Sequence, residues 1–115
     1  MKTFKIIDNN LESELDVFLG ENAQDNWDII DISSQNDIWF HLDDKPSPHV
    51  VLKIPDNLKK KVHKQTILYC GMICKQYSKY DNHKNISIIY TEIKNVTKGK
   101  EIGSVFTKKT QKFQL

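Results

Sequence analysis

The sequence predicts an α+β fold in which a mainly antiparallel sheet packs against one short and one long helix. Short apolar runs with a period of two, bounded by turn residues, occur on both sides of a single long helical pattern. These strand-like runs outnumber the helical ones, which favours antiparallel pairing. The 115 residues are enough for one hydrophobic core and contain no linker-like stretch. We therefore expect residues 1–115 to form a single domain.

The first elements are two strands and a short helix. Residues 4–7 and 15–19 alternate as strands, with a turn near Asn9 and Asn10. Gly20 ends the second strand, and residues 21–32 have helical spacing. Three residues are spaced to share the buried side of this helix, namely Ala23, Trp27 and Ile30.

Two strands joined by a tight turn are predicted next, over residues 37–42 and 49–54. Alternation places Asp37, Trp39 and His41 on one face of the first strand. His49 and Lys53 share a face of the second strand. Two interpretations remain open for the Trp39, His41 and His49 side chains. They are either partly buried scaffold residues with polar partners, or part of a binding surface.

A long helix is predicted from about Leu58 to Tyr80, after a stop and an N-cap in residues 55–57. Its apolar side is formed by Leu58, Val62, Ile67, Tyr69, Cys70, Ile73, Cys74 and Tyr77. We expect both cysteines to be reduced thiols in the core. A separate strip carries Lys60, Lys61, Lys64, Lys75 and Lys79. Lysines in a first helical turn oppose the helix dipole, so this strip is either a binding surface or a solvated face.

Three further strands are predicted in the C-terminal part, over residues 86–91, 104–107 and 113–115. Charge is divided unevenly along the chain. Residues 1–50 hold three lysines and eleven acidic residues, a net charge of −8, whereas residues 51–115 hold fourteen lysines and four acidic residues, a net charge of +10. This asymmetry indicates a polyanionic partner for the basic half, pairing between the two halves, or a contribution to solubility.

Other classes of function find little support in the sequence. It contains no phosphate-binding GxxxxGK[ST] loop, no GxGxxG motif and no GxSxG motif. The four histidines do not form a zinc-ligand spacing with the two cysteines, so we expect no metal and no cofactor. Met1–Lys5 does not begin like a secretory signal, and no apolar run has membrane-spanning length. We expect a cytoplasmic protein that is not an enzyme and does not enter a membrane.

Several motifs together resemble a known family. They are Asp37-Ile38-Trp39-Phe40-His41 with Ser47-Pro48-His49-Val50-Val51-Leu52, then Gly20…Asn22-Ala23…Asn26-Trp27, Tyr77-Ser78, and Tyr90-Thr91…Lys94-Asn95-Val96…Lys98-Gly99…Gly103-Ser104-Val105. In this order they resemble the R domain (NFACT-R, or DUF814-like) of the NFACT proteins, the ribosome quality-control and fibronectin-binding-like factors. Two departures are Pro46, where Gly or Ser is common, and Lys98-Gly99-Lys100 in place of a Lys-Pro-Lys-Gly stretch. The other NFACT modules have no counterpart here, so the chain resembles a stand-alone R domain.

The resemblance implies RNA binding, to tRNA or rRNA, in translation or ribosome quality control. We predict that the nucleic acid is contacted by Lys53, Lys60, Lys64, Lys75, Lys94, Lys98, Gly99, Lys100 and His49. The scaffold of the motif would be Asp37, Trp39, His41 and Ser47. Every basic residue among the seventeen is a lysine. Without the bidentate fork of arginine, recognition should depend on charge and shape rather than on base sequence.

Two alternatives remain open. A short eukaryotic relative with a coiled-coil tail is associated with DNA sensing, so the chain could bind DNA instead. Its acidic first half could also dock a basic protein. The oligomeric state is left open by the sequence.

Overall fold

The computed structural model describes residues 1–56 and 61–115, and its main element is a six-stranded sheet. Its strands are β1 (Lys2–Asp8), β2 (Ser13–Leu19), β3 (Ile38–Leu42), β4 (Val50–Leu52), β5 (Ser87–Glu92) and β8 (Gln111–Gln114). They lie in the order β1-β2-β4-β3-β5-β8, and every neighbouring pair is antiparallel. A two-stranded ribbon of β6 (Val96–Lys98) and β7 (Val105–Thr107) completes the described strands. With two helices, this is the predicted α+β fold.

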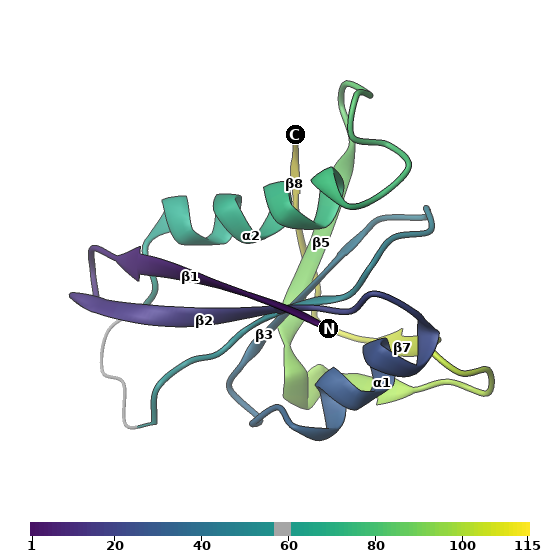
Figure 1. Cartoon of the computed structure of the whole chain (residues 1–115), viewed down its shortest axis with the longest axis horizontal. Coiled ribbons are helices and arrows are strands. Elements are labelled where there is room, and N and C mark those ends of the chain that lie inside the picture. The colour runs from purple at the N-terminus through teal and green to yellow at the C-terminus, as the bar shows by residue number, and fades with distance from the viewer. Residues whose placement is uncertain (57–60) are drawn as a thin grey trace.

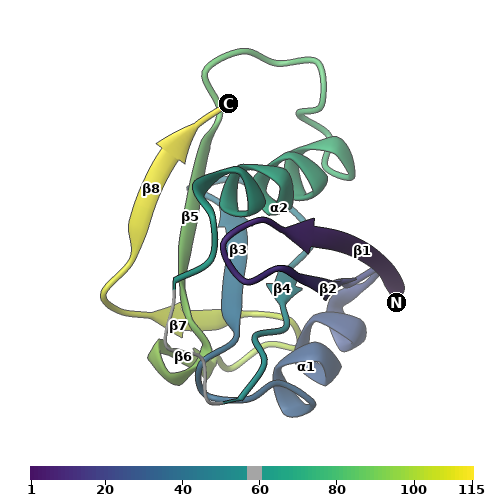
Figure 2. The same ribbon diagram turned by 90° about the vertical axis from the view of Figure 1, so that its left-hand side faces the viewer.

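The sheet separates two layers (Figures 1 and 2). Helix α2 (Lys64–Gln76) covers one face, and helix α1 (Ala23–Asp31) lies on the other side with the β6–β7 ribbon. A 3-10 turn, η1 (Ile93–Asn95), leads from β5 into β6. The described helices are too short and too polar to cross a lipid bilayer.

Strand alternation gives each face its own core. On the α2 side, apolar residues of the central strands pack with Cys70, Ile73 and Cys74 of the helix. The strand residues include Val17, Leu19, Phe40, Leu42, Val50, Leu52 and Ile88. On the α1 side a smaller core joins Ile29, Trp39, Val51 and Ile93. Both cysteines are buried free thiols, as expected.

Helix α1 begins later than predicted and buries a different residue. Asn22 is its N-cap, because the side-chain Oδ1 of Asn22 accepts a hydrogen bond of 2.8 Å from the backbone N–H of Asp25. The buried residue is Ile29, whereas Ala23 is exposed and Trp27 is only half-buried. The predicted buried side, which included Trp27 and Ile30, was therefore wrong, because the buried residue lies between these two positions in the sequence.

Helix α2 is much shorter than the predicted span of residues 58–80. Its first residue is Lys64 and its N-cap is His63, whose Nδ1 accepts a hydrogen bond of 3.0 Å from the N–H of Gln65. The predicted first residue, Leu58, and Lys60 lie outside the described residues. Tyr69 is half-buried and Tyr77 is 42% exposed, so these two rings are not fully inside the core.

The strand predictions differ from the structure in three places. Strands β3 and β4 are paired as predicted, but residues 43–49 separate them, so the connection is not a tight turn. Strand β6 was not predicted, and β8 begins at Gln111 rather than at Phe113. Strand β6 was missed because its residues, Val96–Lys98, pair only with β7 and carry little apolar surface.

Candidate nucleic-acid interface

The lysines predicted to contact phosphate lie in two groups, one on each side of the sheet. Lys64 and Lys75 belong to α2. Lys94 lies in η1, Lys98 ends β6, and Lys100 follows in the β6–β7 loop. Since α2 and the β6–β7 ribbon are in opposite layers (Figure 2), the structure does not bring the two groups together.

In the β6–β7 group, Lys98 is held against α1. Its Nζ lies 2.6 Å from Oδ1 of Asp31 and 5.3 Å from the centre of the Trp27 ring. The indole N–H of Trp27 donates a hydrogen bond of 2.9 Å to the backbone carbonyl of Ser104, which ties the ribbon to the helix. Lys94 lies 3.5 Å from Glu92, whereas Lys100 is exposed and has no ion pair among the described residues.

Gly99 serves the turn of this ribbon. Its backbone N–H donates a hydrogen bond of 2.8 Å to the carbonyl of Ser104. A Cβ at Gly99 would lie only 2.3 Å from Oγ of Ser104, so a side chain here would require Ser104 to move. The Gly99 amide is therefore already used inside the loop, which argues against a direct contact of that amide with phosphate.

The α2 group lies at the two ends of the helix. Lys64 is its exposed first residue and Lys75 is half-buried in the last turn. The helix dipole favours a cation at Lys75 and disfavours one at Lys64. Lys60, predicted to join them, lies outside the described residues.

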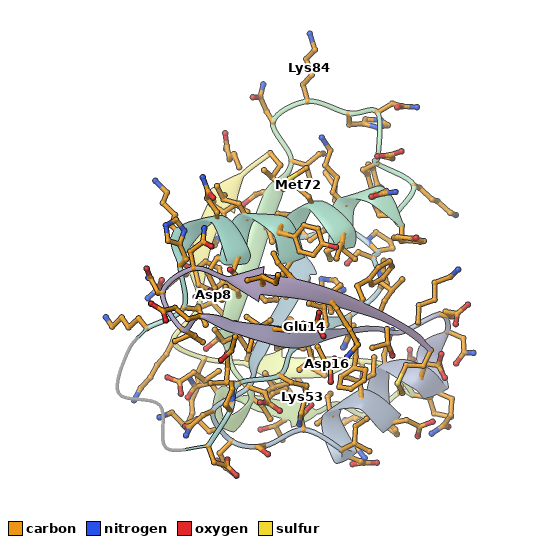
Figure 3. The ribbon with its side chains drawn as sticks, turned by 60° about the vertical axis from the view of Figure 1, so that its left-hand side comes forward. Asp8, Glu14, Asp16, Lys53, Met72 and Lys84 are labelled. Atoms are coloured by element: carbon orange, nitrogen blue, oxygen red, sulfur yellow. The ribbon has the colours of Figure 1, made fainter. Side chains whose placement is uncertain are left out.

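Lys53 belongs to an internal ion pair. Its Nζ lies 2.6 Å from Oδ2 of Asp37 and donates a hydrogen bond of 3.2 Å to the carbonyl of Ile32. The Asp37 side chain is fully buried and also accepts hydrogen bonds from the backbone N–H groups of Ser34 and Ile54. In Figure 3, Lys53 lies on the side of the sheet opposite α2. Lys53 thus neutralises Asp37, and these two contacts leave one of its three ammonium N–H groups for another partner.

Trp39, His41 and His49 do meet on one face of the sheet. The rings of Trp39 and His41 are stacked, with centres 5.6 Å apart and an angle of 8° between their planes. His49 stands almost perpendicular to both, with its ring centre 5.4 Å from that of Trp39 and 5.1 Å from that of His41. Trp39 is 1% exposed and His49 is 3% exposed, whereas His41 is half-buried.

Hydrogen bonds fix the proton positions on both imidazoles. The indole N–H of Trp39 can only donate, so Nδ1 of His49 accepts it over 3.0 Å and the His49 proton lies on Nε2. The carbonyl of Leu42 can only accept, so Nδ1 of His41 carries the proton in that contact. Burial lowers the pKa of His49 to about 3 and also lowers the pKa of His41. Both rings are therefore neutral near pH 7.

This cluster is held in place by Asn26 of α1, Gly20 just after β2 and Ser47 between β3 and β4. The backbone N–H of His49 donates a hydrogen bond of 3.2 Å to Oδ1 of Asn26 in α1. A Cβ at Gly20 would lie 2.0 Å from that same oxygen, so Gly20 leaves the space that Asn26 needs. Ser47 accepts a hydrogen bond of 3.1 Å from the Leu42 N–H and lies 3.6 Å from Sγ of Cys74 in α2.

The roles of Asn26 and Gly20 were not predicted, although both residues belong to the family motifs. One signal in the sequence could have indicated Asn26. It precedes Ile29 by three residues, which places an amide on the buried side of α1. The spatial neighbour of Asn26, His49, is far away in sequence and could not be inferred.

Two hollows of about 510 and 430 Å³ open beside the cluster. They share four lining residues, His41, Pro46, His49 and Gly103, and together we call them the histidine pocket. Lys45 lines one hollow, and Lys79, just after α2, lines the other. Gly103 has a positive φ of 88° and packs against the α1 backbone at Ala23, where a Cβ would approach to 3.0 Å. The pocket therefore lies where both layers meet the end of the sheet.

The architecture recurs in a solved structure. The C-terminal part of the fibronectin/fibrinogen-binding protein from Streptococcus suis superposes with a TM-score of 0.79 at 19% sequence identity. The match covers 100% of this chain and 45% of that chain. At this identity the likeness shows a shared fold.

Sequence comparisons give the family. The family model described as the NFACT protein RNA binding domain matches residues 3–113. Coiled-coil domain-containing protein 25 is 31% identical in Danio rerio and 29% in Mus musculus, over 71% of this chain in each case. The Rqc2 homolog RqcH of Bacillus subtilis is 29% identical over 75% of this chain. The chain spans about two fifths of the coiled-coil relatives and 14% of RqcH. This chain therefore belongs to the NFACT protein RNA binding domain family.

Proposed function

We propose that this chain binds RNA, either tRNA or rRNA, in translation or ribosome quality control, without catalysing a reaction. The observation that carries the proposal is the family match over residues 3–113, because the family is described by its RNA binding. The likeness to RqcH and the resemblance to ribosome quality-control factors support the translation context.

The charges of the chain support an RNA contact dominated by phosphate. Fourteen lysines of the second half meet only four acidic residues there, and the chain contains no arginine. Lysine binds phosphate as a point charge and does not read guanine in a bidentate way. We therefore expect binding that weakens strongly with salt and varies little with base sequence.

The β6–β7 group provides the first test. Changing Lys94, Lys98 and Lys100 together to Gln should weaken binding to a tRNA, because three positive charges are lost from one loop region. The slope of log affinity against log salt should flatten by about 0.7–0.9 for each phosphate contact removed. Since Lys98 is paired with Asp31, we expect its share of the change to be the smallest. Fluorescence anisotropy between about 50 and 200 mM salt measures the slope.

A matched triple variant controls for net charge. Lys2 and Lys5 lie on the edge strand β1, and Lys84 lies at the outer end of the connection after α2 (Figure 3). Changing these three to Gln removes the same charge elsewhere and should leave the slope close to that of the wild type. Equal slopes for the wild type and the β6–β7 variant would exclude that loop from the interface and leave the α2 group as the next candidate.

The two competing functions are separated in the same assay. A DNA of the same sequence as the RNA measures any preference for DNA. The internal ion pairs argue against docking of a basic protein through the acidic half. In that half, Asp31, Asp37 and Asp43 are already paired with lysines of this chain. If docking were the function, a bound basic protein would not be displaced selectively by RNA.

A further inference from the structure

One nitrogen of each imidazole in the cluster has no partner within the protein. Within residues 1–56 and 61–115, no group hydrogen-bonds Nε2 of His41 or Nε2 of His49. In the same residues, every fully buried side-chain nitrogen or oxygen does have a hydrogen-bond partner. The two Nε2 atoms are therefore not fully buried, although the rings themselves are largely buried. Both rings line both hollows of the histidine pocket.

The two open nitrogens have opposite hydrogen-bonding character. Nε2 of His49 carries a proton and donates, because its Nδ1 already accepts from Trp39. Nε2 of His41 has a free lone pair and accepts, because its Nδ1 already donates to the Leu42 carbonyl. The ring centres are 5.1 Å apart. The pocket thus presents one neutral donor and one neutral acceptor on neighbouring, nearly perpendicular rings.

This pair complements one edge that all four nucleobases share. On its Watson–Crick edge each base carries a donor next to an acceptor, such as N3–H and O4 of uracil or the N6 amine and N1 of adenine. In a duplex this edge is occupied by the partner base, whereas unpaired RNA bases are recognised through it. A neutral pair fits a base better than a phosphate, which would need charged or multiple donors.

The surroundings also suit a single nucleotide. The hollows have the size of small-ligand sites, and Pro46, which lines both of them, supplies apolar wall. Lys45 and Lys79 stand at the pocket and can neutralise the flanking phosphates. Among the acidic residues that also line it, Asp43 is paired with Lys112 and Glu21 with the N-terminal amine, while Asp44 has no ion pair in the described residues.

We propose that the histidine pocket binds the Watson–Crick edge of one unpaired nucleobase, with His49 Nε2 as donor and His41 Nε2 as acceptor. This inference rests on the RNA binding proposed above and names the form of RNA at the site. The pocket distinguishes unpaired from paired bases and accepts any of the four. Trp39 acts as a positioning residue, since its indole sets the tautomer of His49 and does not itself reach the base.

The wild-type protein can be tested with three probes of equal phosphate number. They are an oligouridine of about 12 nucleotides, the same oligomer with N3-methyluridine, and a blunt RNA duplex. Methylation at N3 removes the proton that His41 would accept and blocks the edge. We expect oligouridine to bind about five-fold or more tightly than either other probe, the effect of one or two hydrogen bonds.

The variant His41→Ala separates the pocket from the phosphate contacts. It should weaken oligouridine binding about five-fold, to the level of the methylated probe, and leave duplex binding unchanged. His83→Ala, at an exposed histidine outside the pocket, is the matched control and should change none of the three affinities. The methylation experiment uses the wild-type protein, so it decides the question even if the His41 variant does not fold.

Each pattern of results has one meaning. Equal binding of all three probes by the wild type would overturn the pocket and leave RNA binding intact. The base-binding pocket would also be overturned if His41→Ala weakened the binding of all three probes equally. Failure of all three probes and of tRNA to bind at low salt would instead contradict the proposed function itself.

Discussion

At the scale of single residues, the histidines were placed correctly by alternation but their chemistry was not predictable. A period of two in residues 37–42 was enough to put Trp39 and His41 on one face. Which nitrogen of each ring holds the proton depends on the Leu42 carbonyl and the Trp39 indole. Those contacts require the fold, so the sequence favoured a scaffold role for Trp39 and left the role of the histidines open.

Burial of neutral His49 makes the stability of the protein depend on pH. Its pKa is about 3 in the folded protein and near its ordinary value of 6.5 in the unfolded chain. Between these values the unfolded chain binds the proton more strongly, so stability is complete above pH 6.5 and is lost as the pH falls. The free energy of unfolding should decrease by up to about 1.4 kcal/mol for each pH unit from this residue.

Urea unfolding at several values between pH 7 and pH 4 measures this slope. His41 acts in the same direction because burial lowers its pKa too. The variant His49→Gln keeps an oxygen that can accept from Trp39 but does not titrate, and its slope should be clearly flatter. Identical slopes for the wild type and this variant would show that His49 does not carry the effect.

At the scale of elements, the beginning of α2 is set by a buried carboxylate that the sequence did not reveal. Asp8, at the end of β1, accepts hydrogen bonds from the backbone N–H groups of Asn10, Leu11 and His63 and from the hydroxyl of Thr66. Its Oδ2 lies 2.6 Å from Thr66 Oγ1. Burial alone would raise the pKa of Asp8, but these hydrogen bonds outweigh it and hold the pKa below its usual value. Asp8 thus connects the β1–β2 turn to the first turn of α2.

The variant Asp8→Ala should lower the free energy of unfolding by about 3 kcal/mol, because it removes the acceptor of four hydrogen bonds, one of them from the buried hydroxyl of Thr66. Asp16→Ala is the matched control on the same hairpin (Figure 3). Asp16 is exposed and paired only with Lys5, so its loss should cost less than about 1 kcal/mol. Chemical denaturation of both variants checks the difference, and equal losses would refute this role of Asp8.

The length of α2 was overestimated because the hydrogen bonds of Asp8 could not be inferred from the sequence. Helical spacing of apolar residues extends to Val62, but His63 has an extended backbone and its N–H is taken by Asp8. A tertiary hydrogen bond to a residue 55 positions away therefore fixes the N-terminal limit of α2, although the local apolar pattern would extend the helix further. Strands β2, β3 and β5 were predicted well because their apolar residues face buried cores on fixed alternate positions.

At the scale of the whole molecule, part of the uneven charge is paired internally. Asp31 and Asp43 of the acidic half contact Lys98 and Lys112 of the basic half. The sequence predicted the asymmetry but could not decide which lysines were paired, because the partners lie in distant elements. The same limit applies to the candidate interface, because the sequence could not show that its two groups of lysines lie on opposite sides of the sheet (Figure 2).

These pairs are exposed, so salt should affect stability and RNA binding differently. Each exposed pair contributes about 0–1 kcal/mol, and salt screens it. Raising salt from about 50 to 200 mM should therefore shift the melting temperature by only a few degrees while RNA affinity falls by orders of magnitude. Thermal melting and anisotropy in the same buffers test this. Parallel losses of stability and binding would mean that salt weakens binding by unfolding the protein.

The strand order has a consequence for how the protein forms during synthesis. Strand β5 pairs with β3 on one side and with β8 on the other, and β8 is the last strand along the chain. Translation proceeds from the N-terminus, so one edge of β5 keeps unpaired backbone groups until residues 111–114 have left the ribosome. The nascent chain is thus open to strand exchange with a neighbouring copy until residues 111–114 emerge.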